Sequence, residues 1–129
     1  MGGESKTLLT LSIERENKMS IKSLVTHFFT ARTSTGTSEA FKPFGTKKTF
    51  QASGATTAGA GAATVIIEAT NDESLPYVTL GTIALTLGTT AVADGFASDA
   101  AWLFVRARIT AISGTNASLD INMGSIGHS

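Results

Sequence analysis

Residues 102–112 read WLFVRARITAI, and residues 117–123 read ASLDINM. Side chains of a β-strand point alternately to opposite faces, so each stretch divides into two sets. In the first stretch one face holds Leu103, Val105, Ala107, Ile109 and Ala111, and the other holds Trp102, Phe104, Arg106, Arg108 and Thr110. In the second stretch Ala117, Leu119, Ile121 and Met123 share a face. Gly114 lies between the two stretches, and we therefore predict a hairpin of two strands whose apolar faces match.

The same alternation continues upstream in residues 48–52, 63–70 and 77–87. In the last of these the apolar parity changes at Gly81, and a one-residue slip exchanges the two faces of a strand, so we predict a β-bulge or break there. Residues 71–74 are typical of a turn. Residues 53–62 are predicted to be a loop of small residues with Gly54, Gly59 and Gly61, and residues 88–100 a long loop built around Asp94-Gly95 and Asp99. Glycine and alanine in residues 53–62 would also permit close approach of another backbone.

The front third leaves two alternatives open, a strand at residues 22–31 or a short helix within residues 11–24. A native start at Met19 instead of Met1 is a further alternative. Taken together, the segments predict an all-β fold, an antiparallel β-sandwich or jelly roll of about six to eight short strands. We assign residues 1–45 to an extended N-terminal arm and connecting segment, and residues 46–129 to the β-sandwich domain.

The amino-acid composition excludes several classes of partner and chemistry. Ten Lys and Arg balance ten Asp and Glu among 129 residues, so the chain lacks the global charge that marks nucleic-acid or anionic-membrane partners. The sequence contains no cysteine, which excludes disulfides and thiol chemistry. Residues 74–93 are uncharged over the length of a membrane span, but Pro76, Gly81 and Gly88 make them a poor apolar helix. Two strands explain that segment better, and we expect no membrane partner.

The charge is unevenly placed along the chain. Residues 1–48 hold eight Lys and Arg against four Glu, whereas residues 49–129 hold two Arg against six acids. The two parts are either solvated faces or a basic arm that lies on an acidic neighbour, such as another copy of the chain. Arg15, Lys18 and Lys22 are therefore candidate interface residues.

Catalytic and metal-binding patterns are weak. The two histidines, His27 and His128, lack metal-ligand spacing and a local nucleophile. Asp94 and Asp99 lie in one predicted loop, and oxygen-rich loops can bind calcium, but the calcium-loop pattern is missing. The glycines from Gly54 to Gly61 are not followed by the Gly-Lys-Ser/Thr of a phosphate loop. We expect no catalytic residue, metal or cofactor.

One strand face combines Trp102, Phe104, Arg106 and Arg108. Three interpretations of it stay open. It is a second core layer in which Arg106 reaches an internal acid such as Glu68, a protein interface anchored by Trp and Arg, or a stacking platform for a sugar or base.

Residues 49–54 (TFQASG), 63–72 (ATVIIEATND), 94–96 (DGF), 101–107 (AWLFVRA) and 114–117 (GTNA), together with Val78-Thr79-Leu80, resemble small structural proteins of tailed bacteriophages. In that group a β-sandwich carries a Glu-x-x-Asn-Asp strand end and a later Trp-x-x-x-Arg strand. The resemblance covers residues 46–124, and residues 1–45 lie outside it.

The resemblance implies a virion protein without an active site, made in the host bacterial cytoplasm. We expect a head decoration or cement protein that binds the major capsid protein or another virion protein and forms a homo-oligomer, a trimer or dimer. A tail or fibre component is one alternative, and a carbohydrate-binding module for host attachment is another.

Overall fold

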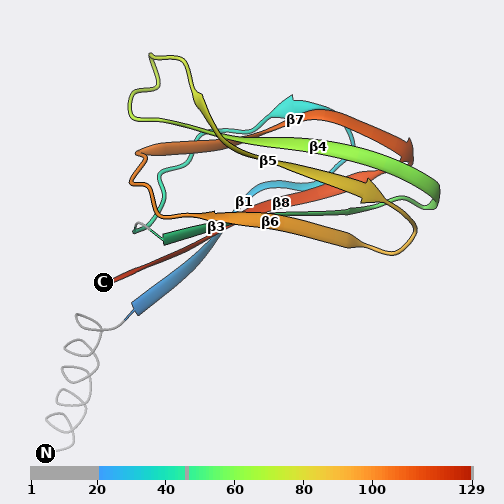
Figure 1. Ribbon diagram of the computed structural model, residues 1–129, viewed down its shortest axis with the longest axis horizontal. Helices are drawn as coiled ribbons and strands as arrows, with labels where there is room; N and C mark the ends of the chain where they lie inside the picture. Colours follow the sequence, from blue (N-terminus) through green and yellow to red (C-terminus); the bar gives the residue numbers. More distant parts are fainter. Residues whose placement is uncertain (1–20, 46, 129) are drawn as a thin grey trace, which may run out of the picture.

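The computed structural model describes residues 21–45 and 47–128, which form two antiparallel sheets stacked as a β-sandwich (Figure 1). The first sheet has the order β1 (Ile21–Arg32), β8 (Ser118–His128), β3 (Lys47–Ala55) and β6 (Val92–Ser98). The second sheet has the order β2 (Gly36–Thr37), β7 (Phe104–Thr115), β4 (Ala58–Thr70) and β5 (Val78–Leu87). The predicted all-β sandwich is confirmed.

The core lies between the sheets because each long strand turns one apolar face inward. From the first sheet it takes Phe28, Phe50, Ala52, Ala117, Leu119, Ile121 and Met123. From the second sheet it takes Ala63, Val65, Ile67, Ala69, Ile83, Leu85, Leu87, Val105, Ala107 and Ile109. The predicted inward sets of residues 117–123 and of the middle of residues 102–112 are therefore confirmed.

The alternation of residues 102–112 fails at both ends. Leu103 precedes the first residue of β7 and is exposed. Toward the other end, Val65 pairs with Ile109 and Thr64 with Ala111, so Thr110 is an extra residue. This bulge exchanges the faces of β7, and Ile112 packs against the core while Ala111 is exposed.

The predicted hairpin of residues 102–112 and 117–123 is wrong. β7 pairs with β4 and β2 in the second sheet, whereas β8 lies between β1 and β3 in the first. The connection at Gly114 and Asn116, both with positive φ, carries the chain from one sheet to the other. Two strands with matching apolar faces bury them equally well as neighbours in one sheet or as facing strands of two sheets. The sequence pattern does not distinguish these two arrangements.

Both predicted loops also contain strand. Residues 53–62 extend β3 and β4, leaving Thr56 and Thr57 as the connection. The small residues allow the predicted close approach, since a Cβ on Gly61 would clash with the Ser113 carbonyl oxygen. Residues 88–100 contain β6, which pairs with β3, and its Phe96 ring lies 5.2 Å from that of Phe50. Its residues are poor strand formers that an edge strand tolerates.

The predicted bulge at Gly81 is confirmed. Ile67 pairs with Gly81 and Glu68 with Thr79, so Leu80 is the extra residue. A Cβ on Gly81 would lie 2.6 Å from Phe96, which explains glycine there. The uncharged residues 74–93 supply β5 and the start of β6, and the described chain holds no helix long and apolar enough to cross a membrane.

Residues 22–31 form a strand, as one of the two alternatives had it, and they belong to β1. β1 pairs with β8 along its length, and the buried Phe28 ring packs against Phe41 and Phe50. The sandwich thus includes parts of residues 1–45, namely β1 and β2, because these residues contribute to its sheets and core. Residues 1–20, with the Met19 start and the candidates Arg15 and Lys18, lie outside the described residues.

The core location of β8 gives a stability prediction. Replacing the fully buried Ile121 with alanine should lower the free energy of unfolding by about 2–5 kcal/mol, because it leaves a cavity between the sheets. Leu75→Ala, at an exposed side chain, serves as the control and should change it by less than about 0.5 kcal/mol. Urea unfolding followed by Trp102 fluorescence measures both, and equal losses would contradict this core assignment.

Candidate interaction surface

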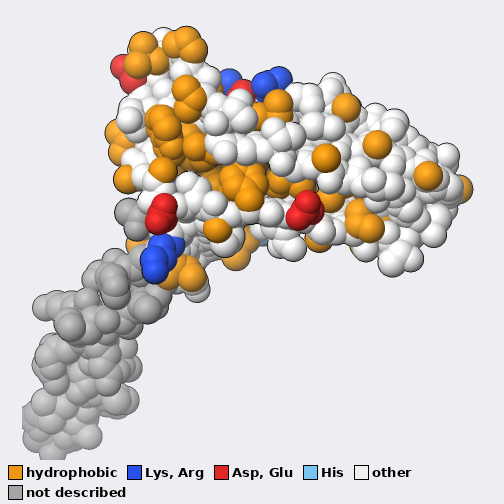
Figure 2. Space-filling model, viewed as in Figure 1, with side chains coloured by type: hydrophobic (Ala, Val, Ile, Leu, Met, Phe, Trp, Pro, Cys, Tyr) orange, Lys and Arg blue, Asp and Glu red, His pale blue; other side chains and the backbone are white. Residues whose placement is uncertain are grey.

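The two ends of the sandwich differ in chemistry. We call the end where β1, β3, β5 and β7 begin, and where β4, β6 and β8 end, the terminal end. The opposite end is called the distal end. The exposed large apolar side chains of the described chain all lie near the terminal end, and they are Leu24, Val25, Leu75, Val78, Leu103 and Ile126. Figure 2 shows hydrophobic side chains gathered over this end of the molecule. Apolar side chains that gather exposed at one end of a domain are candidates for contact with another molecule.

The turns of the distal end are built from small uncharged residues. Residues 53–67, 79–93 and 109–119, which form these turns and the adjoining strand halves, contain no Lys, Arg, Asp or Glu. Arg32 and Asp120 lie beside them on the first sheet, where Arg32 pairs with Leu119 and Asp120 with Ser53. Figure 2 shows this half of the visible face largely free of charged side chains. A partner that recognises large apolar side chains would therefore contact the terminal end.

A buried carboxylate organises the outer face of the second sheet near the terminal end. Glu68 lies directly opposite Arg106 on the neighbouring strand, and Arg108 lies two residues further along β7. The Arg106 Nε donates to Glu68 Oε1 over 3.0 Å, and the Arg108 Nη2 and Nε donate to Oε2 over 3.0 and 3.1 Å. Only 8% of the Glu68 side chain is exposed. The pairing of strands thus fixes both guanidinium groups.

The ionisation of Glu68 depends on these partners. Burial alone would raise the pKa of Glu68, but the hydrogen bonds and charges of Arg108 and Arg106 outweigh burial and hold that pKa below its usual range. The carboxylate therefore stays charged across the neutral range and balances part of the positive charge on this face.

Arg106 also stacks on an aromatic ring. Its guanidinium carbon lies 3.6 Å from the centre of the Tyr77 ring, and the Tyr77 hydroxyl donates to Glu73 Oε1 over 3.3 Å. Burial and the nearby Glu73 raise the pKa of Tyr77. Side chains from β4, β7 and the turn before β5 thereby form one network whose members hold each other in place.

Trp102 and Phe104 lie beside this network, around a hollow of about 290 Å³ that Lys42, Pro43 and Leu103 also line. Trp102 is half-buried and packs against the core, and the Lys42 Nζ lies 5.5 Å from the centre of the Phe104 ring. Of the three interpretations of this strand face, the internal pairing of Arg106 with Glu68 is thus present in the structure. The exposed Leu103 projects from the same segment.

A second and larger hollow, of about 650 Å³, lies on the first sheet. Its lining residues all come from β1, β8, β3 and β6 or directly follow β6, and they are residues 23–25, 124–126, 47–49 and 97–99. None belongs to the second sheet, and the lining includes residues from both faces of the first sheet, since Lys48 and Ser125 share the faces of the core residues Phe50 and Met123. We call it the outer furrow; its lining is mostly apolar, through Leu24, Val25, Ala97 and Ile126.

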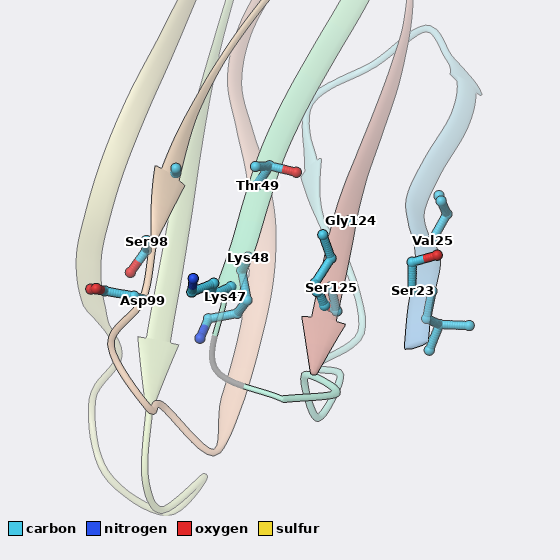
Figure 3. Close-up of a pocket in the computed structure, with 12 residues that line it drawn as sticks. Ser23, Val25, Lys47, Lys48, Thr49, Ser98, Asp99, Gly124 and Ser125 are labelled. Atoms are coloured by element: carbon cyan, nitrogen blue, oxygen red, sulfur yellow. The ribbon is translucent and has the colours of Figure 1, made fainter. Parts of the chain in front are cut away.

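Lys48 is a buried residue that lines the outer furrow. The burial pattern of β3 places its side chain on the same side as Phe50 and Ala52, and its Nζ donates to the Ala100 carbonyl oxygen. Burial lowers the pKa of Lys48, and the charge of Asp99 partly opposes that shift. Figure 3 shows Lys47 and Lys48 extending from β3 toward Ser98 and Asp99. Lys48 therefore fastens the segment that follows β6 to the first sheet.

The structure brings together four of the candidate interface residues, Trp102, Phe104, Arg106 and Arg108. Lys22 lies on β1 in the other sheet, opposite Gly127. Sequence reasoning missed the exposure of Leu24, Val25 and Ile126. The uncharged run at residues 23–31 indicates an apolar strand at Leu24 and Val25 but not that it lies at an edge. Among the described residues, no three His, Asp or Glu side chains gather where they could hold a metal ion.

Comparison with known proteins adds the fold relationship. No protein-family model matches the chain, and no curated protein matches it. Among solved structures, the SPBc2 prophage-derived protein YomS superposes with a TM-score of 0.56 at 13% identity, covering 84% of this chain and 96% of YomS.

Two further solved structures superpose with lower scores. The exported protein XepA of PBSX has a TM-score of 0.47 at 10% identity over 88% of this chain, which spans 38% of XepA. A chain from the disulfide-linked pili of Bacillus endospore appendages has 0.43 at 12% identity, covering 86% of this chain and 88% of that one. The chain therefore shares the sandwich fold of the prophage-derived YomS.

The Glu68 network predicts a pH-dependent stability. Glu68→Gln should lower the free energy of unfolding at pH 7 by about 1–3 kcal/mol, because two guanidinium groups lose a charged acceptor. Since the folded pKa lies below the unfolded value of about 4.3, this contribution is present at neutral pH and disappears as the pH falls through the folded pKa. Urea unfolding from pH 7 to pH 2 should show the gap to wild type closing. Glu39→Gln, at an exposed acid, is the control, and a gap independent of pH would contradict the role of Glu68.

Proposed function

We propose that the chain is a non-catalytic structural protein of a bacteriophage virion, and specifically a head decoration protein that binds the outer capsid surface and stabilises the shell. The observation that carries the proposal is the gathering of exposed apolar side chains at the terminal end, next to a fixed ionic network. Leu75, Val78 and Leu103 expose apolar surface there, and a macromolecular partner would remove it from water.

The Glu68 network favours a protein partner at this end. Rigid Arg and aromatic side chains lose little conformational entropy on binding and are frequent anchors of protein interfaces. The rings that a sugar would need are already in contact, since Arg106 covers Tyr77, Lys42 lies over Phe104 and Trp102 packs on the core. The same residues are thus better suited to a preorganised protein contact than to a stacking platform.

Two further lines support a virion role. The sequence resembles small structural proteins of tailed phages over residues 46–124, and YomS, which shares the fold, is prophage-derived. On a shell, many weak contacts act together because each further contact becomes intramolecular. A protein that binds the assembled lattice better than free subunits favours the assembled state. The major capsid protein is the partner that this role requires.

The test uses heads of the encoding phage that lack this protein. The purified chain should sediment with those heads in a fixed ratio and raise the temperature at which they release DNA. Leu103→Asp should weaken binding at least about tenfold, because it places a charge in the apolar contact. Ala91→Asp, at an exposed distal-end residue, is the matched control and should bind as wild type.

Absence of binding to heads would overturn the decoration role. Binding to tails instead would also overturn it and would assign the chain to a tail or fibre. Equal weakening by Leu103→Asp and Ala91→Asp would refute the terminal end as the contact surface, even if heads bind.

A further inference from the structure

We propose that β1 pairs edge to edge with β1 of a second copy, antiparallel about a two-fold axis at Val25, so that the first sheets of two copies become one continuous sheet. The inference is independent of the virion role, because it rests on the edge of the first sheet alone.

The four sheet edges of the described chain differ in how they are protected. β2 is two residues long, β6 carries Asp94, and β5 follows Pro76 and is distorted by the bulge at Leu80. Short length, charge, proline and bulges are the usual devices that keep edge strands from pairing with other chains. β1 has neither a charge nor a proline from Ser23 to His27, and its ladder with β8 is regular over that stretch, with register shifts only beyond His27.

The backbone groups on the side of β1 away from β8 are suited to pairing with another β-strand. Within the described chain, β8 is the strand that pairs with β1, and an edge strand presents alternate N–H and C=O groups on its other side. A second strand is the partner that satisfies such a row in register. Figure 1 shows the start of β1 and the end of β8 running out together past the body of the sandwich, where another strand can approach.

Exposed apolar side chains accompany this edge on both faces of the sheet. Leu24 and Val25 are 51% and 58% exposed, and as successive residues they point to opposite faces. Ile126, on the neighbouring strand, is also exposed and lines the outer furrow with Val25. Pairing with the same strand of a second copy brings Val25 against Val25 on one face and covers Leu24 on the other.

The charge pattern of β1 fits a copy of itself. A two-fold axis at Val25, the middle of Ser23–His27, places Ser23 opposite His27 and Leu24 opposite Thr26 of the second copy. Lys22 then lies opposite Phe28 of the second copy, and Arg32 lies beyond the paired stretch. Like charges therefore do not meet. Such an interface is self-complementary, as a closed two-fold dimer requires.

A cysteine cross-link tests the register directly, because the chain has no cysteine of its own. In a two-fold pair the two Val25 Cα atoms lie about 4.5–5.5 Å apart, within the range of a disulfide. Val25→Cys should form a disulfide-linked dimer under mild oxidation at micromolar concentration. Val78→Cys, at an exposed valine on an edge strand of the second sheet, is the matched control and should stay monomeric.

A charge variant keeps the proposal falsifiable without oxidation. Wild type should sediment as a dimer. Val25→Lys should raise the dissociation constant of the dimer at least about tenfold, because two ammonium groups would face each other across the pair. Val78→Lys should remain dimeric, and circular dichroism verifies that both variants fold. A wild-type monomer or trimer, or equal cross-linking of the two cysteine variants, would overturn the proposal.

Discussion

The structure depends on the burial of strand faces across two sheets. Every connection except the β4–β5 turn carries the chain from one sheet to the other, so strands that are neighbours in sequence usually face each other across the core. Apolar rows such as Val65, Ile67 and Ile109 in the second sheet meet Phe50, Ile121 and Met123 in the first. Because folding must offset the loss of chain entropy, this shared core is what makes both sheets stable.

The crossings explain the contrast between the two ends. At the distal end three connections cross within a few residues, and their backbones approach so closely that a Cβ on Gly61 or Gly114 would meet neighbouring atoms. Small uncharged residues satisfy that constraint. At the terminal end the strands splay into longer connections, which leave room for Glu68 with its two arginines, for Trp102 and for the exposed apolar side chains. Close packing of the connections at the distal end thus excludes large side chains there, whereas the terminal end accommodates them.

The sequence predicted the fold class and most strand faces because period-two alternation is strong in residues 63–70 and 117–123. It also predicted the bulge at Gly81, and the pairing of Arg106 with an internal acid was one of the three interpretations it left open. It failed where alternation is compatible with two arrangements, as for β7 and β8, and where poor strand formers are held by a neighbour, as in β6. The apolar edge at Leu24 and Val25 was missed because exposure follows from the absence of a covering strand in space. Local sequence does not encode that absence.

In the proposed function the terminal end, and not the distal end, contacts the capsid. Hydrogen–deuterium exchange of the chain alone and bound to heads distinguishes the two ends, because amides covered by a partner exchange more slowly. We expect added protection in residues 71–78 and 99–105, with the distal turns at residues 56–57, 88–91 and 114–117 unchanged. Added protection confined to those distal turns would contradict it.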